Sequence, residues 1–196
     1  MKINITRDEI ITSMDKIEPG LNKYIALMSY KENDVNWLDN MEFRRKFNGF
    51  YRVRRSADSW QRHFYTIMKD AVNQPHSYSD VLNKLYKATN RVEASFASKL
   101  YATVNPDAPV IDAEVLRNLD LRLPSTQKPA ATRISLIVDI YEEMRDCFNQ
   151  YVSTESGDFM TKEFRNRFPE AHITPQKILD LVLWQNRSPK QETNQQ

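Results

Sequence analysis

The sequence predicts an all-α fold, a single-domain helical bundle. Apolar residues recur at helical spacing through most of the chain, and no convincing run alternates apolar and polar residues as a half-buried strand does. Only three glycines occur in 196 residues, fewer than the turns of an all-β domain need. With 40% apolar and 28% charged residues, the composition is that of a globular protein. We therefore expect one helical domain over residues 1–187.

The first helices are marked by cap and breaker residues. Thr6 and Glu9 form a capping box, because the threonine hydroxyl and the glutamate carboxylate can satisfy first-turn amides. The helix that they open is expected to stop at the Pro-Gly pair of residues 19–20, and two further helices follow. The Asn-Gly pair of residues 48–49 predicts a break in the chain.

The middle of the chain carries three more helix starts. Ser56 or Asp58 is the expected N-cap of one helix, and Ser77 leads into another. Residues 92–104 form a central helix, with apolar residues at four-residue steps. A turn with two prolines then leads to Asp112, which is expected to cap the next helix.

The C-terminal third predicts a loop, three helices and a tail. Residues 124–129 begin and end with proline and are expected to form a loop. A long helix over about 130–151 and a shorter one over about 159–167 follow. Thr174 is the expected N-cap of the last helix, with proline at its first position. The polar tail, residues 188–196, is expected to be disordered.

Composition excludes several classes of protein. No stretch approaches the roughly 20 apolar residues that cross a bilayer, and no secretory signal precedes the first helix, so we expect a cytoplasmic protein without a membrane partner. The single cysteine, Cys147, excludes an internal disulfide framework. The scarcity of glycine excludes glycine-rich phosphate loops. His63, His76 and His172 lack metal-ligand spacing, so no metal and no cofactor are expected.

Lys99 and Asp112 are the candidate catalytic residues. Asp112 opens a helix, where it could simply cap the first turn or could place an ionised carboxylate at the mouth of a pocket. Lys99 lies beside an apolar helix face, where a lysine either extends to the surface or becomes a desolvated amine with a lowered pKa. Two helix ends that bring an amine and a carboxylate together suit chemistry at a sugar carbon.

A basic segment is the candidate nucleic-acid contact, although the net charge is only +2. Six of the twelve residues 44–55 are basic, none is acidic, and aromatic residues lie among them. Basic side chains can follow phosphates while an aromatic ring stacks on an unpaired base. The alternative is a solvated turn whose aromatic residues belong to the core. The arginines concerned are Arg44, Arg45, Arg52, Arg54 and Arg55.

Residues 92–119 carry a family resemblance. With the closing segment 173–185, they resemble a group of uncharacterised bacterial proteins whose fold is like that of 8-oxoguanine DNA glycosylase, distant relatives of the helix-hairpin-helix glycosylase superfamily. The resemblance implies a helical bundle with a cleft between lobes, DNA as a partner, and cleavage of an N-glycosidic bond after a base is flipped out. It implies that Asp112 is the catalytic aspartate and that Lys99 is a candidate Schiff-base lysine.

The chain departs from that superfamily at the hairpin. Residues 90–95 contain no glycine, whereas the superfamily's glycine-rich turn lets backbone amides approach a DNA phosphate. The hairpin motif is therefore degenerate, and two further functions stay open. One is a non-catalytic helical module that binds another protein with the same scaffold. The other is an enzyme that uses Lys99 and Asp112 on a different small substrate.

Overall fold

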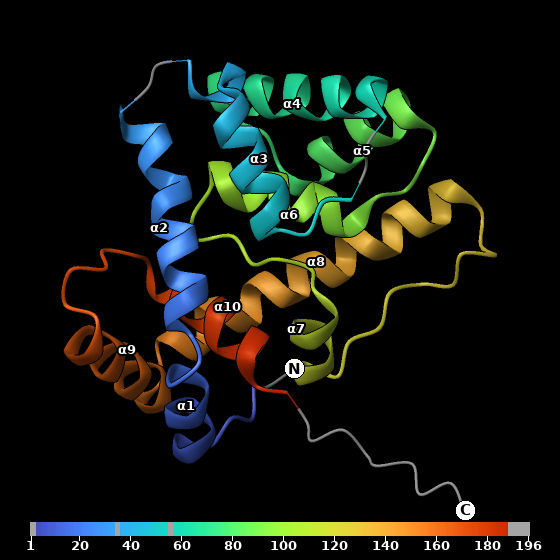
Figure 1. Cartoon of the computed structure of the whole chain (residues 1–196). Helices are drawn as coiled ribbons and strands as arrows, with labels where there is room; N and C mark the ends of the chain where they lie inside the picture. The colour runs from blue at the N-terminus through green and yellow to red at the C-terminus, as the bar shows by residue number, and fades with distance from the viewer. Residues whose placement is uncertain (1–2, 34–35, 55–56, 188–196) are drawn as a thin grey trace, which may run out of the picture.

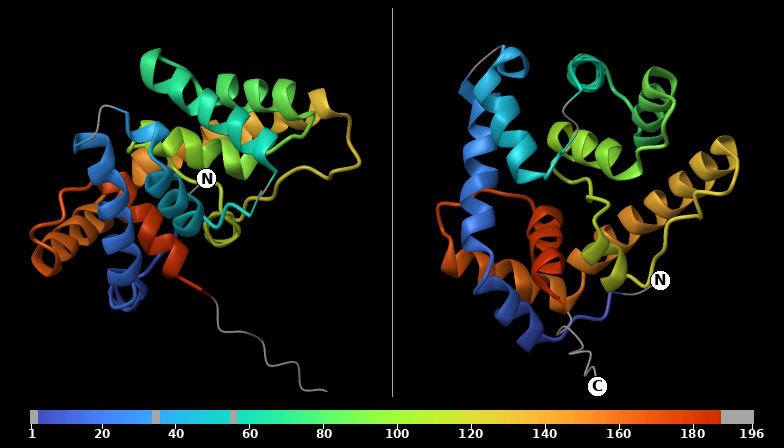
Figure 2. Two further views of the ribbon diagram at one scale, coloured as in Figure 1. Left: turned by 45° about the horizontal axis from the view of Figure 1, so that its top comes forward. Right: turned by 45° about the vertical axis from the view of Figure 1, so that its right-hand side comes forward.

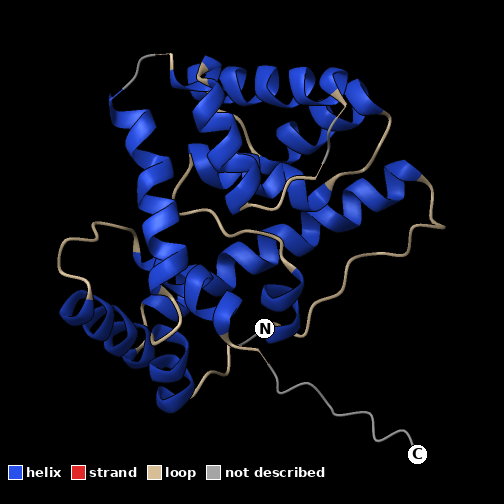
Figure 3. Cartoon of the chain, viewed as in Figure 1, coloured by secondary structure: helices blue, strands red, loops and turns tan. Residues whose placement is uncertain are grey.

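Helices form all the regular structure of the residues that the computed structural model describes, 3–33, 36–54 and 57–187, which confirms the predicted all-α class (Figure 3). In chain order they are α1 (Arg7–Met14), α2 (Glu18–Asn33), the 3₁₀ helix η1 (Trp37–Asp39), α3 (Met41–Phe50), α4 (Asp58–Asn73), α5 (Tyr78–Thr89), α6 (Ala94–Val104), α7 (Ala113–Asn118), α8 (Ala130–Val152), α9 (Glu155–Arg167) and α10 (Pro175–Gln185). The predicted tail, 188–196, lies outside the described residues.

Capping residues fix helix starts at both ends of the chain. The Thr6 hydroxyl accepts a hydrogen bond from the Glu9 amide at 3.2 Å, and the Thr6 amide donates to the Glu9 carboxylate at 2.8 Å, which completes the predicted capping box. Thr174 caps α10, and Pro175 occupies its first position, as predicted. Proline is well placed there because a first-turn amide has no acceptor within the helix.

The two predicted breaks fall inside helices. The pair at residues 19–20 lies in the first turn of α2. Backbone amides in the first turn have no acceptor within the helix, so a proline there, which lacks an N–H, costs the helix no hydrogen bond. The pair at residues 48–49 lies within α3, which continues to Phe50. That helix ends instead in a turn where the Val53 amide donates to the Asn48 carbonyl at 2.8 Å and Arg52 adopts a left-handed φ of 54°. The helix therefore ends one residue after the predicted break at residues 48–49.

The start of α4 also differs from expectation. Asp58 is the first helical residue, and Ala57 is the N-cap without a side-chain hydrogen bond. Asp58 still suits this place, because a carboxylate in the first turn is stabilised by the helix dipole. Ser56, the other predicted cap, lies outside the described residues.

The helices gather into two groups joined by long helices (Figures 1 and 2). In the first group, α4, α5 and α6 contact one another, with α3 beside them. In the second group, α10 lies at the centre and contacts α1, α7, α8 and α9. The helix α2 runs from the second group to α3, and α8 contacts both α5 and α10. This arrangement leaves the end of α3, α6, α7 and α10 facing one another where the two groups meet.

A continuous hydrophobic core holds both groups together. Phe47 on α3 packs against Phe64 and Tyr65 of α4, at ring-centroid distances of 5.6 and 6.0 Å. Tyr78 on α5 stacks on Tyr141 of α8 at 3.7 Å, which joins α8 to the first group. Burying each such large side chain stabilises the fold by about 1.5–3 kcal/mol. Among the described helices, none combines the length and the apolar character that crossing a bilayer requires.

Candidate functional site

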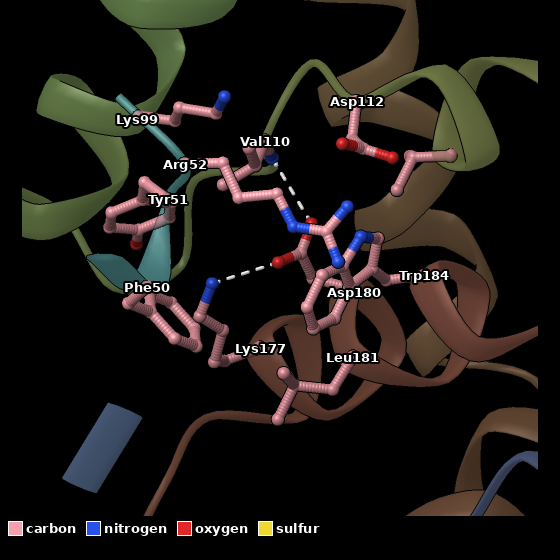
Figure 4. A pocket seen from close by; sticks show the side chains of 11 residues that line it. Phe50, Tyr51, Arg52, Lys99, Val110, Asp112, Lys177, Asp180, Leu181 and Trp184 are labelled. Carbon is pink, nitrogen blue, oxygen red and sulfur yellow. Dashed lines mark hydrogen bonds and ion pairs between the residues drawn. The ribbon is translucent and has the colours of Figure 1, made fainter. Parts of the chain in front are cut away.

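A pocket opens where the two helix groups meet (Figure 4). The empty space within it, open mouth and adjoining solvent included, is about 510 Å³. The lining residues come from the end of α3, from α6, from α7 with the segment before it, and from α10. They are Phe50, Tyr51, Arg52, Lys99, Val110, Asp112, Val115, Lys177, Asp180, Leu181 and Trp184.

Lys99 projects from α6 into this pocket. Its neighbour Leu100 is fully buried, and the Lys99 ammonium lies 5.3 Å from the centroid of the Phe96 ring. Burial lowers the pKa of Lys99, the Asp112 carboxylate opposes that shift, and the Arg52 guanidinium adds to it. Lys99 is half-buried, and the direction of this pKa shift favours the desolvated amine over a lysine that extends to the surface.

Asp112 caps α7 and lines the same pocket. Its Oδ1 accepts a hydrogen bond from the Glu114 amide at 3.0 Å, so the predicted capping role is confirmed. In the described part of the chain, no side-chain cation lies within 4.0 Å of the Asp112 carboxylate. The carboxylate therefore acts as a cap and also faces the space that Lys99 lines (Figure 4).

The segment before Asp112 is anchored on both sides by buried side chains. The Val110 amide donates to Asp180 Oδ1 on α10 at 3.2 Å. The next amide, of Ile111, donates to the Ser98 hydroxyl on α6 at 2.9 Å. Both bonds are buried, and each satisfies an amide that neither a helix nor water serves. The position of Asp112 is thus set by two helices that are distant in sequence.

Lys177 and Asp180 form an ion pair in the wall of the pocket. These two residues were not among the candidate residues predicted from the sequence. The Lys177 ammonium lies 2.8 Å from Asp180 Oδ2, and their side chains are only 1% and 9% exposed. Burial alone would lower the pKa of Lys177, but the charge of Asp180, its hydrogen bond and the nearby Tyr51 and Tyr24 together outweigh burial and hold that pKa above its usual value. The ammonium also lies 4.8 Å from the Tyr24 ring centroid. A lysine and an aspartate three residues apart in an otherwise apolar helix were the available signal.

Among the described residues of the basic segment 44–55, Arg52 is the cation that lines the pocket. Its guanidinium lies 5.7 Å from the Trp184 ring centroid, and Figure 4 shows the side chain extending across the pocket toward that ring. Among the described residues, no carboxylate lies within ion-pair distance of Arg52. Its left-handed backbone, uncommon for a residue with a side chain, is set by the turn that ends α3.

The remaining predicted arginines separate into different roles. Arg44 donates to the Leu38 carbonyl at 2.8 Å and stacks over the Tyr65 ring, 4.7 Å from its centroid, so it serves the fold. Arg45 is exposed on α3, away from the pocket lining. Arg54 is exposed, and no hydrogen bond or ion pair to it is found within the described ranges. Arg55 lies outside the described residues.

The histidines do not assemble into a metal centre. The His76 Nδ1–H donates to the Gln74 carbonyl at 2.7 Å, and the other ring nitrogen lies beside the Lys84 ammonium. Within residues 3–33, 36–54 and 57–187, no three His, Cys, Asp or Glu side chains lie close enough together to hold a metal ion. The groups that line the pocket are amines, a guanidinium, carboxylates and aromatic rings.

No protein-family model, no curated protein and no solved structure matches this chain. The resemblance to glycosylases therefore stays a prediction.

Proposed function

We propose that this protein is a DNA-binding, glycosylase-like protein that takes one unstacked nucleotide into the pocket. The observation that supports this most strongly is the set of groups that line it. Arg52 and Lys99 bring two cations without a carboxylate partner in the described residues, and Phe50 and Trp184 bring aromatic rings. The two cations attract a phosphate, and a nucleobase can stack on the aromatic rings.

Asp112 supplies the group for cleavage of the N-glycosidic bond in this proposal. The bond between the sugar C1′ and the base nitrogen breaks, a water oxygen bonds to C1′, and the departing base takes up a proton from solvent, which Asp112 replaces when it releases the proton of the attacking water. Positive charge develops on the sugar as the base departs, and the carboxylate of Asp112 stabilises it while accepting the proton of the attacking water. Lys99 is a second candidate nucleophile, because a lowered pKa leaves more of its amine unprotonated.

A binding and base-release assay tests both parts. The full chain is titrated with short single-stranded and duplex DNA at low salt, and released base is measured with damaged and undamaged substrates. We expect binding that weakens with salt, and base release that Asp112→Asn abolishes while DNA binding persists. An absence of DNA binding at low salt would reject the proposal. Base release that Asp112→Asn leaves unchanged would reject the role of Asp112.

The second candidate is a non-catalytic module that binds another protein through the same scaffold. Two observations favour it: Asp112 already has a structural task as the cap of α7, and residues 90–95 lack glycine. This function predicts that Asp112→Ala lowers stability by about 1 kcal/mol, the usual effect of losing a cap, and leaves partner binding intact. Affinity capture that recovers nucleic acid alone would count against it.

A further inference from the structure

A second hollow of the surface, the α2–α3 groove, adjoins the pocket. We define it by Lys23 and Ala26 on α2 and by Arg45, Lys46, Gly49 and Phe50 on α3. Its empty volume is about 1130 Å³ including open solvent. A side chain built at Gly49 would meet no atom within 4 Å, so this glycine faces open space. The groove is therefore a free surface of two packed helices.

The rim of the groove is positively charged. Lys23 and Arg45 are exposed, and the lining includes no acidic residue. The nearest carboxylate partner is Glu42, which lies 3.6 Å from Arg45 and 3.5 Å from Lys46 and so serves two cations at once. One shared carboxylate leaves a net positive rim, which fits a polyanion.

Phe50 lies at the border between the groove and the pocket. It lines both hollows, and its ring centroid lies 6.0 Å from that of Tyr24 and 6.4 Å from that of Trp184. A strand that leaves the pocket on the side of Phe50 reaches the groove. The face of α2 between Pro19 and Ala26 is about 10 Å long at 1.5 Å per residue, which spans about two or three phosphates of one strand.

We infer that the α2–α3 groove binds the DNA single strand that flanks the nucleotide in the pocket. The inference rests on the proposed function and specifies its substrate class. In a single strand the bases are free to stack on Phe50 and on the apolar floor, while the backbone follows Lys23 and Arg45. In a duplex the bases are stacked on one another, so they could not reach the apolar floor without unpairing first.

Binding measurements that separate the groove from the pocket test the inference. The full-length protein is titrated with a deoxynucleoside monophosphate, a single-stranded DNA of eight nucleotides and the matching duplex, at several salt concentrations. The variants are Lys23→Ala/Arg45→Ala, which removes charge, and Gly49→Tyr, which fills the groove from a position with open space. Lys87→Ala, an exposed lysine of α5 outside both hollows, is the matched control.

We expect the octanucleotide to bind about ten-fold more weakly to both groove variants, with monophosphate affinity within about two-fold of the parent protein. The double variant should also reduce the salt slope by about 1.4, at roughly 0.7 for each phosphate that is no longer neutralised. Lys87→Ala should change neither value.

An octanucleotide that binds no better than the monophosphate, or groove variants that bind it normally, would overturn the inference and leave the pocket proposal standing. Tighter binding of the duplex would overturn it as well. Binding of none of the three probes would reject the pocket proposal itself.

Discussion

Asp180 accepts a hydrogen bond from the amide of Val110 at 3.2 Å, and Val110 lies two residues before Asp112. The same carboxylate holds the Lys177 ammonium at 2.8 Å. Asp180 therefore joins a buried charge to the segment that positions the candidate catalytic carboxylate. Since the pair is desolvated, its two members depend on each other far more than an exposed pair would.

Replacing Asp180 by alanine should destabilise the protein by about 3–5 kcal/mol, because it leaves the Lys177 ammonium buried without a counter-charge. Guanidinium unfolding monitored by circular dichroism measures this. Replacing both members, with Lys177→Met and Asp180→Leu, should cost much less than Asp180→Ala alone. The control is Asp158→Ala, which breaks the exposed Lys162–Asp158 pair and should cost under about 1 kcal/mol. Equal losses for the buried and the exposed pair would contradict the assigned role of Asp180.

Asp112→Ala should lower the free energy of unfolding by about 1 kcal/mol, because the Glu114 amide loses its acceptor. Asp112→Asn should cost little, since asparagine caps helices as well as aspartate does. The comparison separates the cap from the charge: any activity or binding that both variants lose depends on the carboxylate charge. If Asp112→Asn destabilises as much as Asp112→Ala, the capping geometry at the start of α7 is wrong.

The pKa of Lys99 should lie below that of the exposed lysines and respond to its two charged neighbours. Asp112→Asn should lower the pKa of Lys99 further, and Arg52→Gln should raise it, because the first removes a stabilising charge and the second a repelling one. NMR titration of the lysine ε-methylene signals measures both shifts. Lys87, exposed on α5, provides the reference signal. Shifts of the same sign in both variants would be inconsistent with this arrangement.

The lowered pKa also predicts how stability depends on pH. Between the folded pKa of Lys99 and its unfolded value near 10.4, the unfolded chain binds more protons, so stability rises with pH through that window. Below the folded pKa the full penalty for burying the charged amine is present. Lys99→Met removes this group, so the difference in unfolding free energy between Lys99→Met and the parent protein should shrink as pH approaches 10.4. A difference that stays constant would show that Lys99 is not desolvated.

Replacing Arg44 and replacing Arg54 should affect different properties, stability and DNA binding, although both residues belong to the basic segment 44–55. Arg44→Ala should destabilise the protein, because it removes a hydrogen bond to the Leu38 carbonyl and the contact with the Tyr65 ring. Arg54→Ala should leave stability within about 0.5 kcal/mol, as exposed side chains without partners usually do. Under the proposed function it should weaken DNA binding at low salt. Thermal unfolding and a salt titration check the two expectations.

Sequence alone determined the class of the fold and many of its helix ends. The capping box at Thr6, the cap at Asp112 and the Thr-Pro start of α10 depend on side chains within one turn of the residue concerned, so local chemistry is sufficient to find them. The turn preference of Asn48 and Gly49 located the end of α3 only approximately, because the helix continues one residue further, to Phe50.

Tertiary structure alone decided which of the candidate residues meet. Lys99, Asp112 and Arg52 come from three segments of the chain, and only the folded arrangement of α6, the start of α7 and the end of α3 brings them to one pocket, which α10 also lines. The same packing lets Arg44 donate to the Leu38 carbonyl and brings Asp180 within hydrogen-bond distance of the Val110 amide, 70 residues away in sequence. Desolvation and long-range hydrogen bonds depend on neighbours that no local pattern of residues specifies, and this is why the lowered pKa of Lys99 and the buried Lys177–Asp180 pair became visible only in the folded chain.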